Sequence, residues 1–171
     1  CNNNGNEPCS SGTYSGYGTY KAVDGDLSTV AAIHPGDYPN EGEHAAEYSD
    51  HNWMQIQFAG GRKRVRYVKF YNRDPTGVDG SYPNRKAWNH KVSIYAGNGL
   101  ITPACNNENP PAHGNCPAME KLCLTVDFAT LGTSYAADEV TADCGDVRAE
   151  YVLVWQHYAT FEAFGTGGRD G

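Results

Sequence analysis

The sequence is poor in aliphatic residues and has no long hydrophobic run. Leu, Ile, Val and Phe together number 26 of 171 residues, below the roughly 20% at which intrinsic disorder becomes a concern. Disorder also requires strong charge repulsion, and here the net charge is only −7 in a chain with 12 Tyr, 5 Phe and 3 Trp residues. No segment approaches the ~20 apolar residues needed to cross a bilayer. We therefore expect a folded domain that does not insert into a membrane.

Sequence motifs of the common enzyme classes are also absent. The chain has no G-x-S-x-G nucleophile elbow and no H-E-x-x-H zinc motif. The carboxylate pair of a glycosidase meets in space rather than in sequence, so that alternative stays open. The excess of acidic residues argues against nucleic acid as a partner, because its phosphates attract a positive surface. The sequence therefore predicts a non-catalytic protein.

Six cysteines are present, but none of them forms a C-x-x-C pair. This spacing argues against zinc, and an even number of cysteines in a Gly- and Tyr-rich chain is typical of disulfides formed outside the cell. We therefore expect a secreted protein with three disulfides. Six cysteines allow 15 pairings, and pairing between neighbours in the sequence predicts Cys1–Cys9, Cys105–Cys116 and Cys123–Cys144.

Short segments in which apolar and polar residues alternate are the main secondary-structure signal. In one of them Met54 and Ile56 share a face, and in another Val92 and Ile94 do. Short strands separated by Gly, Pro and Asn turns predict an all-β sandwich or barrel. The Pro- and Asn-rich stretch 102–118 predicts a disulfide-tied surface loop. The strand candidates are residues 53–58, 65–72, 90–96, 122–126, 151–156 and 160–164.

Residues 1–19 are rich in Asn, Gly, Ser and Tyr and have almost no aliphatic side chain. They predict an extended, disulfide-looped arm ahead of a single β-sandwich domain at 20–171, and we expect Cys1 to begin a processed segment. Such an arm can add a strand to the sheet edge of a neighbouring subunit. An alternative function is therefore that of a structural or adhesive subunit in an extracellular assembly or homo-oligomer.

Two acidic residues flank a glycine at Asp24-Gly25-Asp26. Calcium takes about six to eight oxygen ligands, and a tight Gly turn can direct several carboxylate and carbonyl oxygens to one point. The other interpretation is an Asp-Gly turn capped by its own side chain, which is common. The spacing alone favours the capped turn.

An Arg stands beside an Asp at the end of a predicted strand, in Arg73-Asp74. The guanidinium donates hydrogen bonds and the carboxylate accepts them, so the pair can bind adjacent sugar hydroxyls. The C–H side of a sugar also favours an aromatic ring, for which Tyr38 and Trp88 in nearby loops are candidates, whereas Trp53 is expected in the core. An ion pair within the turn is the equally supported alternative.

Several short motifs follow one another in an order that resembles a known superfamily. They are residues 22–25, 53–58, 65–73, 92–95, 151–154 and 161–165. Their order resembles the discoidin, or coagulation-factor C-type, superfamily, which implies a galactose-binding-like jelly-roll β-sandwich. The cysteine-bearing loop after Tyr95 and the spacing from Cys144 to Tyr151 are most similar to its F-type (fucose-binding) lectin branch. The resemblance covers roughly residues 10–165.

The resemblance implies a structural calcium ion that ties the first turn to the last strand. The last strand supplies one ligand, which is Glu162 in one register and would be Thr160 in another. Carried over onto the matching positions, the ligands are the Lys21 and Asp26 carbonyls, the Asp24 carboxylate, Thr29 and Glu162.

The resemblance also implies a sugar site. His34 matches the sugar-binding His of the lectin branch, and Arg73, Asp74 and Arg85 correspond to its basic and acidic sugar-binding residues. Because Arg73-Asp74 lacks the spacer residue of that branch, the implied function is sugar binding in general rather than fucose specificity. The sequence thus predicts a secreted, calcium-stabilised carbohydrate-binding module for fucose- or galactose-containing glycans.

Overall fold

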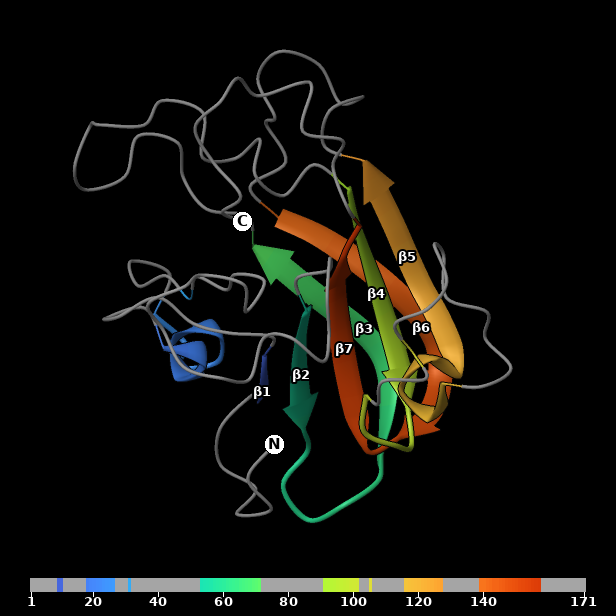
Figure 1. Ribbon diagram of the computed structural model, residues 1–171. Helices are drawn as coiled ribbons and strands as arrows, with labels where there is room; N and C mark the ends of the chain where they lie inside the picture. The colour runs from blue at the N-terminus through green and yellow to red at the C-terminus, as the bar shows by residue number, and fades with distance from the viewer. Residues whose placement is uncertain are drawn as a thin grey trace, which may run out of the picture.

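The computed structural model describes most of the sandwich and some of the residues that connect its strands. The described residues are 9–10, 18–26, 31, 53–71, 91–101, 105, 116–127 and 139–157. Within them the chain forms seven strands in two antiparallel sheets and two short 3-10 helices (Figure 1). The predicted all-β sandwich is therefore confirmed.

The larger sheet has five strands in the order β1-β2-β7-β4-β5, and the smaller sheet pairs β3 with β6. The strands of the larger sheet are β1 (Cys9–Ser10), β2 (Trp53–Gln57), β7 (Tyr151–Gln156), β4 (Lys91–Gly97) and β5 (Lys121–Asp127). Those of the smaller sheet are β3 (Lys63–Tyr71) and β6 (Glu139–Ala149), and the 3-10 helices are η1 (Thr19–Ala22) and η4 (Pro117–Met119).

The main core lies between the two sheets. Val92 and Ile94 of β4 and Val152 and Val154 of β7 pack there against Val65 of β3 and small residues of β6. Met54 pairs with Val154 and Ile56 with Val152, so the predicted inward faces of these strands are the observed ones. Figure 1 shows β4 and β7 crossing in front of β3 and β6.

The opposite face of the five-stranded sheet is buried as well. Trp53, Tyr95, Leu153 and Trp155 form a second cluster there, covered by residues of the segment that follows β4 and by η4. Trp53 is in the core, as expected, but on the side opposite Met54 and Ile56. The stretch 102–118 was expected to be a disulfide-tied surface loop. The Cys105–Cys116 disulfide confirms the tie, but of the described residues only Pro117 is exposed, while Cys105, Cys116 and Ala118 are buried against the sheet.

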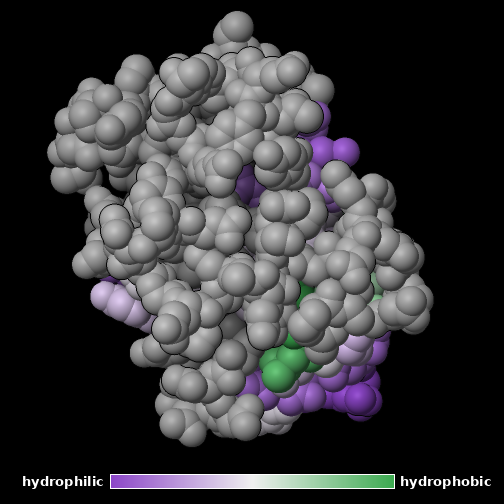
Figure 2. All heavy atoms as spheres, viewed as in Figure 1, coloured by the Kyte–Doolittle hydropathy of each residue, from purple (hydrophilic) through white to green (hydrophobic). Residues whose placement is uncertain are grey.

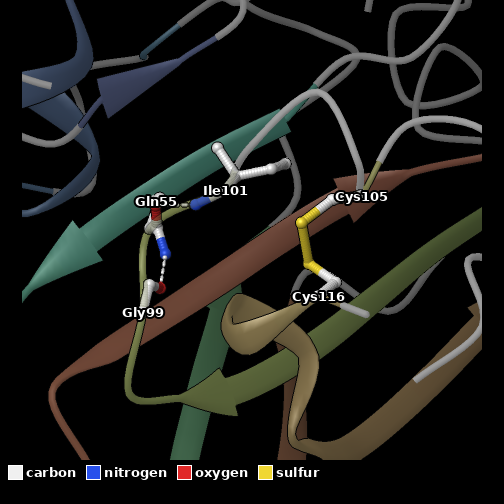
Figure 3. Close-up of a disulfide and its surroundings, with 5 residues drawn as sticks. All are labelled: Gln55, Gly99, Ile101, Cys105 and Cys116. Carbon is white, nitrogen blue, oxygen red and sulfur yellow. Dashed lines mark hydrogen bonds between the residues drawn. A yellow bond between two sulfur atoms is a disulfide. The ribbon is translucent and has the colours of Figure 1, made fainter. Parts of the chain in front are cut away.

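The side chain of Gln55 fixes the segment that follows β4 to the sheet. Gln55 is 1% exposed; its Nε2 donates to the Gly99 carbonyl (2.8 Å), and its Oε1 accepts from the Ile101 amide (3.0 Å). Figure 3 shows Gln55, Gly99 and Ile101 together with the Cys105–Cys116 disulfide. The polar atoms of the buried Gln55 side chain are thus hydrogen-bonded to the backbone of residues that follow β4.

A second disulfide, Cys123–Cys144, joins the two sheets, since Cys123 belongs to β5 and Cys144 to β6. Ile94 pairs with Leu124 and Tyr95 with Leu122, so Cys123 is the extra residue of a β-bulge. A bulge redirects a side chain, and here Cys123 packs against the main core. Cys105–Cys116 and Cys123–Cys144 are pairings that the sequence predicts, whereas Cys1 lies outside the described residues and Cys1–Cys9 stays a prediction.

Two strands were not expected from the sequence. β1 pairs Cys9 with Gln55 and Ser10 with Met54, so this part of the predicted arm is an edge strand of the larger sheet. β6 is the longest described strand and pairs with β3 along most of its length. The predicted strand 160–164 lies outside the described residues. Among the residues that are described, no helix is long and apolar enough to cross a membrane.

Candidate functional site

The described strands meet at one end of the sandwich, which we call the loop end. Tyr71 pairs with Glu139, Lys91 with Asp127, and Trp53 with Trp155, so three strands begin and three finish there. Figure 1 shows this end at the top. At the opposite end, which we call the closed end, the chain turns at residues 58–62 and the Glu150 amide donates to the Gly97 carbonyl (3.0 Å).

The predicted sugar-binding residues belong to segments that are attached at the loop end. Arg73 and Asp74 follow Tyr71, the last residue of β3, and Trp88 precedes Lys91, the first residue of β4. A second such segment leads into Trp53 of β2. The predicted residues themselves, His34, Tyr38, Arg73, Asp74, Arg85 and Trp88, lie outside the described residues.

The Asp-Gly turn follows η1 and is exposed. The Asp26 amide donates to Asp24 Oδ1 (2.9 Å), and Gly25 has a φ of 80°, which favours glycine. This hydrogen bond is the one expected of a turn capped by its own side chain. A carboxylate has two oxygens and about four lone-pair sites, so the capping bond and a metal bond are compatible.

The donors of this turn fit calcium in kind, because carboxylate and carbonyl oxygens are the ligands that it prefers. Lys21, Asp24 and Asp26 lie within one short stretch of chain, while Thr29 and Glu162 lie outside the described residues. In the part of the chain that the structure describes, no three His, Cys, Asp or Glu side chains gather into a metal site. A calcium ion at this turn therefore stays a prediction.

The outer face of the β3–β6 sheet carries a polar and aromatic surface that we call the tyrosine face. It consists of three cross-strand pairs: Tyr67 with Asp143, Lys69 with Thr141, and Tyr71 with Glu139. The intervening residues Val68 and Phe70 point the other way, into the main core. Tyr67 is 53% exposed and Tyr71 is 44% exposed, which makes them accessible aromatic rings on a regular strand.

Charged neighbours hold both rings in place. The Lys69 Nζ lies 2.8 Å from Glu139 Oε1, and the hydrogen bonds from Lys69 and then Tyr71 lower the pKa of Glu139. The same contact with Glu139 raises the pKa of Lys69 and the pKa of Tyr71. At the other end of the face, the Arg66 guanidinium lies 5.2 Å from the centroid of the Tyr67 ring, a cation–π distance.

Sequence reasoning missed this surface, although part of its signal is visible. Tyr67, Lys69 and Tyr71 occupy every second position of a strand whose alternate residues, Val68 and Phe70, are apolar, and this period of two places all three on one face. The sequence pattern does not reveal the partner strand β6, so it does not place the acidic residues Glu139 and Asp143 on this surface.

A group of hydrogen-bonded polar side chains lies on the other sheet, near the loop end, with Ser93 and His157 buried and Thr125 exposed. Ser93 Oγ is 2.7 Å from His157 Nε2 and 2.7 Å from Thr125 Oγ1, and the His157 amide donates to the Lys91 carbonyl. A Ser–His contact is also found in nucleophilic enzymes, but Ser93 is only 1% exposed. These hydrogen bonds therefore satisfy the buried polar groups of Ser93 and His157 and join β4, β5 and the residue after β7.

No family model and no curated protein sequence matches this chain. Solved structures do resemble it. A fucose-binding module from Streptococcus pneumoniae superimposes with a TM-score of 0.50 at 15% identity, covering 90% of this chain and 80% of the module.

Two other solved structures match this chain over a comparable share of its length. The lectin domain of lectinolysin, in complex with Lewis B antigen, has a TM-score of 0.49 at 19% identity, with coverage of 91% and 84%. A chitosan-binding module from a Paenibacillus sp. IK-5 chitosanase/glucanase has a TM-score of 0.48 at 17% identity, with coverage of 89% and 83%. The similarity to the S. pneumoniae module, together with the two antiparallel sheets, shows that this chain has the same β-sandwich fold as that module.

Proposed function

We propose that the protein is a secreted, non-catalytic carbohydrate-binding module that binds fucose- or galactose-containing glycans at its loop end. The observation that carries the proposal is the meeting of strand ends there, because it attaches both segments with predicted sugar-binding residues to one end of the sandwich. The S. pneumoniae module with this fold is described as fucose-binding, which supports the same function here.

The predicted residues supply the groups that a sugar requires. Arg73, Arg85 and His34 donate hydrogen bonds to sugar hydroxyls, and Asp74 accepts them. Trp88 or Tyr38 offers a ring to the C–H side of the sugar. A site of this kind fixes a ligand by a few directed polar groups beside an aromatic surface.

The proposal includes no catalytic step. Among the described residues, Ser93 and His157, which form the one Ser–His contact named above, are both buried, which supports binding rather than nucleophilic chemistry. Disulfides at Cys105–Cys116 and Cys123–Cys144 support an extracellular location, because oxidising compartments preserve them.

Calcium is part of the proposal as a structural ion. The Lys21 and Asp26 carbonyls, the Asp24 carboxylate, Thr29 and Glu162 would hold it. When bound, such an ion supplies a fixed positive charge that orders the oxygens of the turn. The Asp24 turn is exposed and contains two carboxylates, and the mutual repulsion of these charges is a reason for a cation to stabilise it.

The sugar site is tested by calorimetric titration of the intact chain with L-fucose, D-galactose and oligosaccharides that contain them. We expect saturable binding that Arg73→Ala and His34→Ala each weaken by about tenfold or more, the loss expected when a charged hydrogen bond is removed. The matched control is Arg62→Ala, because Arg62 is exposed at the closed end. Equal binding by Arg73→Ala and the control would contradict the proposed site.

The metal is tested on the same protein by thermal melting with calcium and with a chelator. Calcium is expected to raise the melting temperature, and Asp24→Asn is expected to remove most of that increase. Asp127→Asn, at the end of β5 and outside the turn, is the control. An increase that survives in Asp24→Asn would assign the ion to another site.

The alternative of an assembly subunit stays a prediction. Cys9 and Ser10 pair with β2 of their own chain, which supports a module that uses this strand within one molecule. Size-exclusion chromatography at high concentration separates the two functions, since an assembly subunit would elute as a large or polymeric species.

A further inference from the structure

The tyrosine face offers two aromatic rings that are already oriented for a ligand. Tyr71 lies directly opposite Glu139 of β6, and Glu139 in turn contacts Lys69 and Thr141. Tyr67 is covered on one side by the Arg66 guanidinium. Both side chains therefore lose little conformational freedom when a ligand stacks on them, which reduces the entropic cost of binding.

The charges on this face compensate one another. Lys69 lies between Tyr67 and Tyr71 and contacts Glu139. Arg66 precedes Tyr67, and Asp143 lies opposite that tyrosine. Beyond Arg66 the Arg64 and Asp146 side chains approach to 3.5 Å, with Arg148 opposite Arg64. A surface with balanced charge gives no net attraction to a polyanion or a polycation. It does offer many donors and acceptors to an uncharged ligand rich in hydroxyl groups.

The centre of the face argues against a protein partner. Stable protein interfaces have a dry, apolar centre with the polar groups around it. Here the arrangement is reversed: Lys69, which lies between the two tyrosines on β3, forms an ion pair with Glu139, and both side chains are substantially exposed. Such a centre suits hydroxyl groups, which can hydrogen-bond to the charged side chains without removing all of their water.

The spacing of the rings sets the size of the ligand. Tyr67 and Tyr71 are four residues apart on one strand, which corresponds to about 13 Å along β3. One sugar ring is too short to touch both. A ligand that stacks on both must consist of several linked sugars in an extended chain.

We propose that the tyrosine face is a second carbohydrate-binding surface, which runs along the β3–β6 sheet from the loop end toward the closed end, and that its ligand is an uncharged linear polysaccharide lying along β3. Tyr67 and Tyr71 stack on its sugar rings, and Lys69, Glu139, Asp143 and Thr141 bind its hydroxyls. This surface consists of described strand residues, so its binding does not depend on the sugar site proposed at the loop end.

The test is affinity electrophoresis of the intact chain through gels that contain soluble polysaccharides. Uncharged xylan, mixed-linkage glucan, hydroxyethyl cellulose and galactomannan are compared with anionic alginate and carrageenan. We expect at least one uncharged polysaccharide to retard the protein. Tyr67→Ala and Tyr71→Ala are each expected to weaken that binding by about five- to tenfold, in line with the free energy of an aromatic contact.

Two further variants separate stacking from a structural effect. Tyr67→Phe keeps the ring and is expected to keep the binding. Tyr20→Ala removes a tyrosine that is 50% exposed on η1, outside the face, and is expected to bind as the wild type does. Thermal melting of each variant checks the fold, because neither ring of the face belongs to the two core clusters.

Three results would overturn the proposal. The first is a wild-type chain that no uncharged polysaccharide retards, or that only the anionic ones retard. The second is retardation that both alanine variants retain in full. The third is self-association of the wild type, seen by sedimentation, that Tyr67→Ala abolishes in the absence of any polysaccharide binding. Failure of the loop-end site is recognised independently, by the calorimetric titration with fucose and galactose.

Discussion

Three side chains of the tyrosine face control one another's protonation. Hydrogen bonds from Lys69 and Tyr71 lower the pKa of Glu139. Its contribution to stability is therefore present above the ordinary carboxyl pKa of about 4.3 and is lost as the pH falls through the lower pKa of the folded state. The pKa of Lys69 is raised, so its contribution is present below about pH 10.4 and is lost as the pH rises further. Because all of these groups are exposed, the effect on stability is small.

Replacing Lys69 by Met is expected to raise the pKa of Glu139 toward its ordinary value, because the largest cause of the lowering is removed. An NMR titration of the Glu139 carboxyl carbon measures this shift. Lys121→Met is the control, since Lys121 lies on β5 in the other sheet. A Glu139 pKa that is the same in Lys69→Met as in the wild type would show that the 2.8 Å contact is not maintained in solution.

At the scale of strands, the structure explains which elements the sequence reveals. β7 (YVLVWQ) and β4 (KVSIYAG) are rich in β-branched and aromatic residues, which suit a strand covered on both faces. β6 (EVTADCGDVRA) has Ala, Asp and Gly instead, and these residues are rare in strands. Two of its inward positions, Ala142 and Cys144, are small, so the alternation of apolar and polar residues over 139–144 is only a weak hydrophobic signal.

The segment after β4 was interpreted as a surface loop for a related reason. Its Pro and Asn residues indicate turns, but composition does not show which side of a segment faces a sheet. Cys105, Cys116 and Met119 are buried by contacts with Trp155 and its neighbours, which are distant in the sequence. Gln55 likewise gives no signal of its own, because a glutamine in a strand is usually exposed.

Gln55→Ala is expected to destabilise the protein by about 2–4 kcal/mol, since it leaves the half-buried Gly99 carbonyl and the buried Ile101 amide without their hydrogen bonds. Urea unfolding, followed by tryptophan fluorescence, measures the change. The control is Gln57→Ala, which removes a single contact, with Glu150 (3.0 Å), from a half-buried side chain, and is expected to cost less than about 1.5 kcal/mol. Equal losses in the two variants would contradict the anchoring role of Gln55.

At the scale of the whole molecule, a small number of aliphatic residues is sufficient because the central strands β4 and β7 of the larger sheet are buried on both faces. One face packs on β3 and β6, and the other is covered by a disulfide-closed segment and η4. The surface that Figure 2 shows toward the closed end is mainly hydrophilic, with one small hydrophobic group. The Cys123–Cys144 disulfide links the two sheets across the main core.

Removing that link with Cys123→Ala and Cys144→Ala together is expected to cost about 3 kcal/mol, the chain-entropy value for a loop of this length. The two cysteines are 21 residues apart in the sequence. Urea unfolding of the double variant under non-reducing conditions measures the loss, and the corresponding variant of Cys105 and Cys116 provides the comparison. An unchanged unfolding midpoint would contradict a stabilising role for the link between the sheets.

The candidate site was predictable only in part, for physical reasons. The order of the motifs identifies the fold, and the fold determines that the segments after Tyr71 and before Trp53 are attached at the loop end. The same information does not determine how side chains in those segments converge, because loop conformation depends on contacts across the whole end. The tyrosine face required the pairing of β3 with β6, which follows from packing between distant segments and not from either strand alone.

The central claim, that this protein binds glycans, is tested most directly by a glycan array probed with the intact chain, once in calcium and once with EDTA. The account predicts binding to a defined group of fucose- or galactose-containing glycans in calcium, with weaker binding after chelation because the metal-ordered turn is lost. A correctly folded, disulfide-bonded chain that binds no glycan under either condition would contradict the account.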